Sequence, residues 1–114
     1  MNERKNNTMK RLKDNVTIIT GAGKGIGFGV ASAFAKEGSN LVITGRNENI
    51  LLEAKAKLEK EYGVKVLALV ADGADEEKIK EVIAKTVATF GKINTLINNA
   101  QASKSGLSLI EHTK

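Results

Sequence analysis

The sequence predicts an α/β fold with one parallel, doubly wound sheet covered by helices on both faces. Three observations support this prediction. Short runs rich in β-branched residues recur along the chain, amphipathic helical stretches alternate with them, and glycines or capping residues stand at the junctions. Strands that alternate with helices of this length are joined by right-handed crossovers, which place successive strands parallel. We expect one domain with the order βαβαβαβ, because 114 residues suffice for one core and not for two.

The first strand is expected at residues 16–20, where the run Val-Thr-Ile-Ile-Thr stops at Gly21. A continuous β-branched run of this length is typical of a strand buried on both faces. Residues 25–36 then place small and apolar side chains at helical spacing, and Gly38 supplies a stop signal for a helix. The pattern predicts a buried strand that leads through a glycine-rich turn into a helix.

Two further strand–helix units and a fourth strand follow. The remaining strands are expected at residues 41–44, 65–70 and 93–98. Asn47 and Asp75 are expected to cap the two intervening helices, and Gly91 ends the second of them. If the strands order as 3-2-1-4, the winding direction reverses beside the first strand and the third helix moves to the opposite face. This is a Rossmann-type arrangement, and its ligand crevice opens at the carboxyl end of the first strand.

The chain divides into three segments by composition. Residues 1–13 form a basic tail with five basic residues and one acidic residue, and either Met1 or Met9 could be its start. Residues 14–100 form the Rossmann-type domain. Residues 101–114 are expected to be a loop and a truncated C-terminal segment, with at most the start of a helix near residues 107–110. The predicted sheet is therefore incomplete, and we expect its fourth strand to present an unpaired edge.

Composition excludes several functional classes. The net charge of +5 comes mostly from the tail, and aromatic residues make up only 4% of the chain, so no stacking platform for nucleic acid is expected. The chain has no cysteine and one histidine, which argues against disulfides and conventional metal sites and fits a reducing cytoplasm. No apolar stretch is long enough to span a bilayer, so no membrane partner is expected.

The glycine-rich segment Thr20-Gly21-Ala22-Gly23-Lys24-Gly25-Ile26-Gly27 is the main candidate for a binding site. A diphosphate needs close backbone approach and free N–H donors, and a helix that begins after a glycine turn supplies both. Gly21 makes the tight turn, Gly25 admits the phosphates, and Gly27 lets the helix lie against the sheet. The spacing matches neither G-x-G-x-x-G nor the phosphate loop of kinases and ATPases. A purely structural turn is the alternative.

The segment resembles the Thr-Gly-x-x-x-Gly-x-Gly motif of the short-chain dehydrogenase/reductase (SDR) family. Asp72 stands where that family has its adenine-contacting aspartate, and Asn98-Asn99-Ala100 resembles its Asn-Asn-Ala-Gly motif, with Gln101 replacing the glycine. The resemblance covers roughly residues 9–114. It implies a bound nicotinamide dinucleotide whose contacts come from the glycine turn and the ends of the strands: Gly21, Gly23, Lys24, Gly25, Ile26, Gly27, Arg46, Asp72, Gly73, Asn98 and Ala100.

The charge pattern favours NADP(H), with NAD(H) as the weaker alternative. NAD sites place an acidic residue at the end of the second strand, and here that position holds Gly45, followed by Arg46. Lys24 projects from the glycine turn, as in NADP-preferring members of the family. Two charge-assisted contacts to a 2′-phosphate would favour NADP(H) by about 10² to 10⁴. The alternative is that both cations are ordinary surface residues.

The resemblance implies hydride transfer between nicotinamide and a carbonyl or alcohol, with serine, tyrosine and lysine as catalytic residues. In the family these lie beyond the fourth strand. The single tyrosine, Tyr62, precedes Lys65 by three residues instead of four and is expected to pack in the core. His112 and the serines at 103, 105 and 108 are interpreted as a solvated segment, so no catalytic residue and no metal ligand is assigned.

Three functional hypotheses follow. The chain is the cofactor-binding half of an NADP(H)-dependent oxidoreductase that is inactive in this form, a stand-alone NADP(H)-binding or sensing module, or a truncated remnant. The substrate is not predicted. A full-length relative is expected to form homo-oligomers, whereas this expectation does not extend to the chain itself. The expected partner is the dinucleotide.

Overall fold

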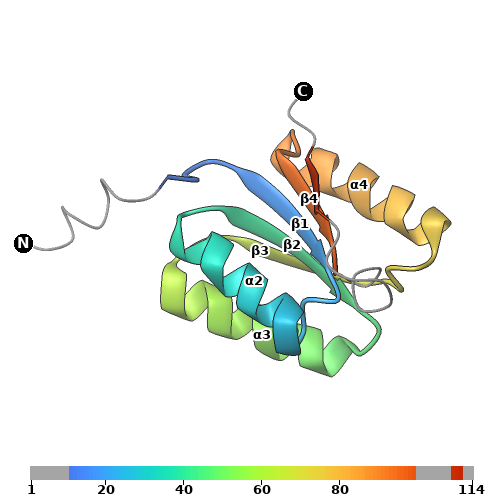
Figure 1. The fold of residues 1–114 in the computed structure, drawn as a ribbon, viewed down its shortest axis with the longest axis horizontal. Coiled ribbons are helices and arrows are strands. Elements are labelled where there is room, and N and C mark those ends of the chain that lie inside the picture. Colours follow the sequence, from blue (N-terminus) through green and yellow to red (C-terminus); the bar gives the residue numbers. More distant parts are fainter. Residues whose placement is uncertain (1–10, 100–108, 112–114) are drawn as a thin grey trace, which may run out of the picture.

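The computed structural model describes residues 11–99 and the backbone of residues 109–111. Five strands form one sheet in the order β3-β2-β1-β4-β5, and Figure 1 shows them with the three helices. The strands are β1 (Val16–Thr20), β2 (Asn40–Gly45), β3 (Val66–Val70), β4 (Thr95–Asn98) and β5 (Leu109–Glu111). The helices are α2 (Gly25–Lys36), α3 (Glu48–Tyr62) and α4 (Glu76–Phe90).

The predicted parallel order 3-2-1-4 is confirmed. β1 pairs in parallel with β2 on one side and with β4 on the other, so that Ile18 lies opposite both Val42 and Leu96. β3 pairs in parallel with β2. The winding direction therefore reverses at β1, which leaves the carboxyl end of this strand open for a ligand.

β5 corrects the sequence prediction at the end of the chain. It pairs antiparallel with β4, with Leu96 opposite Ile110, where we expected a loop or the start of a helix and an unpaired edge. A short apolar run does not distinguish a strand from a helix by its own periodicity. The free backbone groups along β4 decide the outcome here, because a strand edge accepts such a run as a partner.

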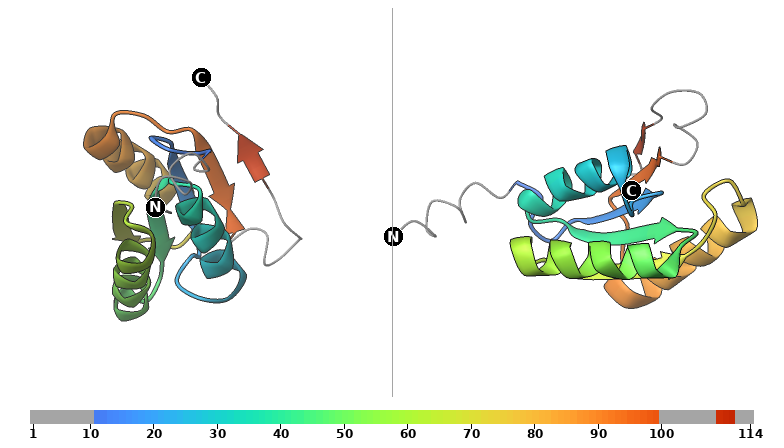
Figure 2. Two further views of the ribbon diagram at one scale, coloured as in Figure 1. Left: turned by 90° about the vertical axis from the view of Figure 1, so that its left-hand side faces the viewer. Right: turned by 90° about the horizontal axis from the view of Figure 1, so that it is seen from below.

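Alternating side chains of the sheet build two cores. One contains Ile19 and Ile43 from the strands and packs against α2 and α3. The other contains Ile18 and Val42 and packs against Val82 of α4. Figure 1 shows α2 and α3 side by side and α4 beyond the strands, and Figure 2 gives two further views of the same arrangement. The third helix thus lies on the opposite face, as the sequence predicts.

The predicted helix caps are present. The Asn47 side chain accepts a hydrogen bond from Ile50 N, and the Asp75 side chain accepts from the amides of Glu77 and Lys78. α3 and α4 end at Gly63 and Gly91, and both glycines have a left-handed backbone that other residues adopt at a cost. Among residues 11–99, no helix has the length and apolar character needed to cross a bilayer.

Glu59 connects α3 to the first residue of β3. One of its carboxylate oxygens accepts a hydrogen bond from Lys55 Nζ at 2.9 Å and another from Val66 N at 3.1 Å. The Lys55 contact is the largest cause of a lowered pKa of Glu59, and burial opposes it. The ionised carboxylate therefore stabilises the folded chain.

This lowered pKa predicts a pH-dependent contribution to stability. A carboxyl group whose pKa is lower in the folded chain stabilises it above the unfolded pKa, 4.5 for Glu59, and loses that effect as pH falls through the folded pKa. Glu59→Gln should therefore lower the melting temperature near neutral pH, and the difference from the parent should shrink as pH falls through the lowered folded pKa and Glu59 itself becomes protonated. Thermal melts of both proteins across this range test the prediction. A melting-temperature difference that does not change with pH would contradict it.

Candidate functional site

A cleft of about 600 Å³ opens at the carboxyl end of the parallel strands. Its walls come from the turn after β1, from the junction of β2 with α3, from the segment after β3 and from the residue after β4. The lining residues are Gly21, Gly23, Lys24, Gly45, Arg46, Asn47, Ile50, Leu51, Ala71, Asp72, Gly73, Ala74 and Asn99. The reversal point of the strand order and the glycine turn therefore lie at the same cleft, as the sequence predicts.

The glycine turn needs glycine for two different reasons. Gly21 and Gly25 both have φ of 65°, in the left-handed region that side chains disfavour. Gly27 is buried, and a Cβ there would overlap the carbonyl oxygen of Gly21 and lie 2.8 Å from Asn99 Nδ2. Close contact between the start of α2 and the turn thus depends on the missing side chain.

The first turn of α2 is suited to bind an anion. Lys24 is its N-cap residue and has an extended backbone, and its side chain makes no capping hydrogen bond. Amides in the first turn of a helix have no partner within the helix, and the helix dipole favours negative charge there. A diphosphate placed at this helix end would satisfy these donors.

Hydrogen bonds to β2 and to the residue after β4 hold the glycine turn. On one side Ala22 N donates to Thr44 O of β2 at 3.0 Å. On the other side Asn99 Nδ2 donates to Gly21 O at 3.1 Å. The first bond is made by backbone atoms alone, whereas the second depends on the identity of a side chain, which makes Asn99 a positioning residue for the turn.

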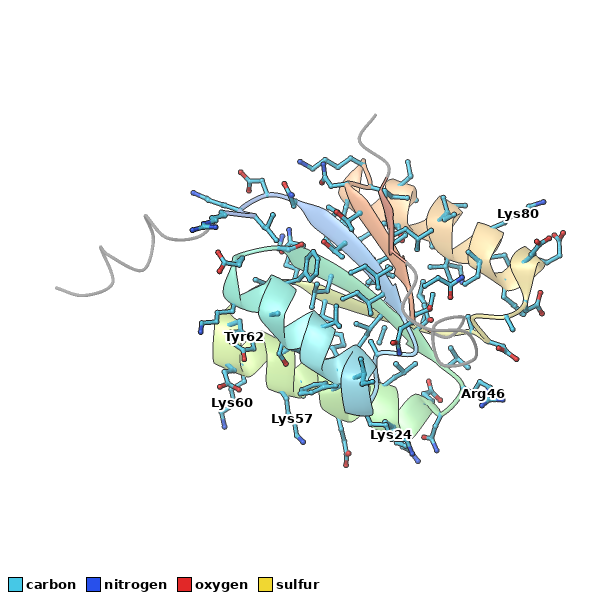
Figure 3. The ribbon with its side chains drawn as sticks, viewed as in Figure 1. Lys24, Arg46, Lys57, Lys60, Tyr62 and Lys80 are labelled. Atoms are coloured by element: carbon cyan, nitrogen blue, oxygen red, sulfur yellow. The ribbon has the colours of Figure 1, made fainter. Side chains whose placement is uncertain are left out.

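Lys24 and Arg46 are exposed and line the same cleft. Figure 3 shows both at the end of the molecule where α2 and α3 begin. Gly45, the last residue of β2, supplies no carboxylate, and a Cβ at this position would lie 3.3 Å from Leu51 Cδ2. The rim of the cleft beside β2 is therefore cationic.

Asp72 and Gly73 line the cleft on the side of β3. Asp72 Oδ1 accepts a hydrogen bond from Ala74 N at 2.9 Å, and its carbonyl accepts one from Asp75 N at 2.9 Å. These bonds fix the turn before α4 and with it the carboxylate of Asp72. Gly73 is buried.

The structure brings six of the predicted contact residues together in the cleft: Gly21, Gly23, Lys24, Arg46, Asp72 and Gly73. Gly25, Ile26 and Gly27 form the adjoining first turn of α2, where Ile26 is 75% exposed. Asn98 lies in β4 and accepts a hydrogen bond from Thr20 Oγ1 at 2.9 Å. Ala100 lies outside the described residues, as do Gln101, the three serines and His112.

Sequence reasoning missed several residues of the cleft. Asn47, Ile50 and Leu51 enter it from the start of α3, Ala71 and Ala74 flank Asp72, and Asn99 follows β4. The capping role of Asn47 was a signal that α3 begins beside the cleft. The pair Asn98-Asn99 was a second signal, although the pattern does not tell which amide faces the turn.

Tyr62 lies far from the cleft. It is half-buried and packs against the core beneath α2 and α3, as the sequence predicts. In Figure 3 it lies at the end of α3 away from Arg46. Within the described part of the chain, no three His, Cys, Asp or Glu side chains gather closely enough to hold a metal ion.

Comparison with known proteins agrees with this geometry. Residues 15–112 match the family model described as short chain dehydrogenase. The chain is 55% identical over 105 residues to a 12α-hydroxysteroid dehydrogenase of Clostridium sp., covering 87% of this chain and 40% of that protein. The chain thus spans about 40% of the length of this relative.

Two solved structures share the fold. L-sorbose reductase from Gluconobacter frateurii, complexed with NADPH and L-sorbose, matches with a TM-score of 0.73 and 34% identity over 77% of this chain and 34% of that one. NAD⁺-bound xylitol dehydrogenase matches with a TM-score of 0.72 and 32% identity over 76% of this chain and 33% of that one. The chain belongs to the short-chain dehydrogenase/reductase family, and its incomplete Rossmann-type fold corresponds to the amino-terminal part of that family's proteins.

Proposed function

We propose that this chain binds NADP(H) as the cofactor-holding part of an oxidoreductase that transfers hydride between nicotinamide and a carbonyl or alcohol group. The observation that carries this proposal is the joint presence of Lys24 and Arg46 on the cleft of the glycine turn, with Gly45 where an NAD site has an acid. Two cations and no carboxylate at this rim favour a ligand with an additional phosphate.

The residues present fit such a cofactor. A cleft of about 600 Å³ has the size of a small-molecule site. The first turn of α2 would hold the diphosphate, Lys24 and Arg46 the 2′-phosphate, and Asp72 the adenine. Among the structural neighbours, L-sorbose reductase is complexed with NADPH and xylitol dehydrogenase is bound to NAD⁺. When bound, the nicotinamide ring would give or accept the hydride.

We expect the 114-residue chain to bind cofactor without turning over substrate. No residue of the described cleft is a tyrosine or serine that could act on a carbonyl. A non-catalytic NADP(H)-binding module and a truncated remnant are the alternatives. The coding sequence after Lys114 separates the oxidoreductase from both alternatives, because an enzyme would continue with a serine followed by Tyr-x-x-x-Lys. NADPH titration then separates a module, which binds, from a remnant, which does not.

For a protein that continues in this way, we propose a hydroxysteroid as the first substrate class to test. The support is the 55% identity to a 12α-hydroxysteroid dehydrogenase. NADP⁺-dependent oxidation of a 12α-hydroxysteroid by the longer protein is the assay, and its failure would leave cofactor binding by the present chain unaffected. We also propose a cytoplasmic location, in keeping with the absence of cysteine, and homo-oligomers for the longer protein.

Variants of the cationic rim test the cofactor preference. Arg46→Ala should weaken NADPH binding by about 10- to 100-fold and leave NADH binding nearly unchanged, because only NADPH carries the 2′-phosphate. Gly45→Asp should also weaken NADPH binding, through repulsion, and should strengthen NADH binding. Dissociation constants for both cofactors come from fluorescence titration.

Gly45→Asn is the matched control for the aspartate variant. It brings the same crowding against Leu51, since a Cβ at position 45 lies 3.3 Å from Leu51 Cδ2, but it adds no charge. Only the aspartate should therefore reverse the preference. Equal affinity of the parent chain for NADPH and NADH would contradict the proposed role of Lys24 and Arg46.

A further inference from the structure

β3 is the outermost strand on one side of the described sheet. Leu41 N donates to Lys65 O, and Ala71 N donates to Gly45 O. In a parallel ladder this places the backbone groups of residues 65, 67, 69 and 71 toward β2. The N–H and C=O groups of Val66, Ala68 and Val70 therefore point away from the sheet, along its edge.

This edge has the features of a strand that self-associates. The residues from Val66 to Ala71 are all apolar and uncharged, and Val70 is 53% exposed. Strand edges with such sequences are templates for pairing with another chain. The described edge thus needs some feature that keeps it free.

The edge is also self-complementary. An antiparallel pair related by a two-fold axis at Ala68 would place Ala68 opposite its own copy and Val66 opposite Val70 of the second copy. Each of the three residues whose backbone groups point outward would then lie opposite another such residue. Each Val66 N–H would donate to a Val70 carbonyl of the other copy. The two Val66 amides are the outermost donors of this arrangement.

In the structure, the Val66 amide already donates a hydrogen bond to Glu59. Its carboxylate accepts from Val66 N at 3.1 Å and is held in place by Lys55 Nζ at 2.9 Å. The carboxylate lies at the edge itself, so a second strand would have to displace a charge-assisted hydrogen bond at both ends of the pair. A charged group at a strand edge opposes pairing in this way.

We propose that the Glu59 carboxylate blocks the Val66 amide at the β3 edge and so opposes pairing of this edge with β3 of a second copy of this chain. The proposal concerns the sheet edge and is independent of cofactor binding. Glu59→Ala removes the carboxylate and leaves Val66 N–H free to donate across the two-fold axis. Glu59→Gln keeps a carbonyl oxygen that can accept from Val66 N, so it should behave more like the parent.

Sedimentation equilibrium of the 114-residue chain over a concentration series tests the proposal. Glu59→Ala should dimerise with a dissociation constant about tenfold lower than that of the parent. Glu61→Ala is the matched control, because Glu61 is an exposed carboxylate on the same helix, and it should equal the parent. Thr86→Ala removes a buried hydrogen bond on α4 and controls for general loss of stability.

Two further measurements locate the interface. Adding Val70→Lys to Glu59→Ala should return the dissociation constant to the parent value, since pairing would bury the new charge. Amide hydrogen exchange at Ala68 and Val70 should slow in the Glu59→Ala dimer. The proposal is overturned if Glu59→Ala associates no more than Glu61→Ala or Thr86→Ala, or if its dimer persists with Val70→Lys and leaves these two amides unprotected.

Discussion

Replacing Gly27 with alanine is expected to abolish NADPH binding and to lower the melting temperature of the chain. The added Cβ would overlap Gly21 O and crowd Asn99 Nδ2, and neither the backbone carbonyl nor the tethered amide can move without opening the turn. Overpacking against backbone costs about 1 to 3 kcal/mol or more. Because the opened turn no longer presents its amides, affinity should fall by at least about 100-fold.

Gly29→Ala is the control on the same helix. Gly29 is exposed, its φ is not positive, and nothing lies within 4 Å of an added Cβ. Alanine there should stabilise α2 by about 0.5 to 1 kcal/mol and leave NADPH affinity unchanged. Thermal melts and fluorescence titration of both variants give the two readouts. Retained NADPH affinity in Gly27→Ala would show that the turn does not contact the cofactor.

The second large effect is expected at Asn99. Gly21 O can only accept a hydrogen bond, so Asn99 must act through its amide donor, which aspartate lacks. Asn99→Asp therefore removes the bond and places a negative charge beside a carbonyl oxygen. We expect NADPH affinity to fall by about 10- to 100-fold, because leaving the partly buried Gly21 carbonyl without its partner costs about 1 to 3 kcal/mol.

Asn94→Asp is the matched control for this change. Val16 N can only donate, and it donates to Asn94 Oδ1 at 2.8 Å, so aspartate at position 94 keeps the acceptor. The same substitution at two asparagines near β4 should therefore affect NADPH affinity at one position only. NADPH titration and thermal melts separate a role of Asn99 in cofactor binding from a purely structural role. A purely structural role would lower the melting temperature and leave the NADPH affinity of the folded protein intact.

Local signals explain why so much of the fold could be predicted. The β-branched runs, the caps Asn47 and Asp75 and the glycine stops act over a few residues, and the structure contains each of them. Right-handed crossovers then leave few ways to order four parallel strands, which makes 3-2-1-4 predictable. The cleft follows from this order, because the glycine turn stands at the reversal point.

Contacts between distant residues were decided by the tertiary structure. Asn99 donates to Gly21 O across 78 positions, and its neighbour Asn98 accepts from Thr20 Oγ1 across the same separation. β5 forms because β4 has a free edge, which the composition of residues 107–110 does not reveal. Local propensities act along the chain, whereas hydrogen-bond partners depend on which strands become neighbours. The sequence alone therefore determined the sheet order and the place of the cleft, and only the folded chain decided which side chains hold the glycine turn and the edges of the sheet.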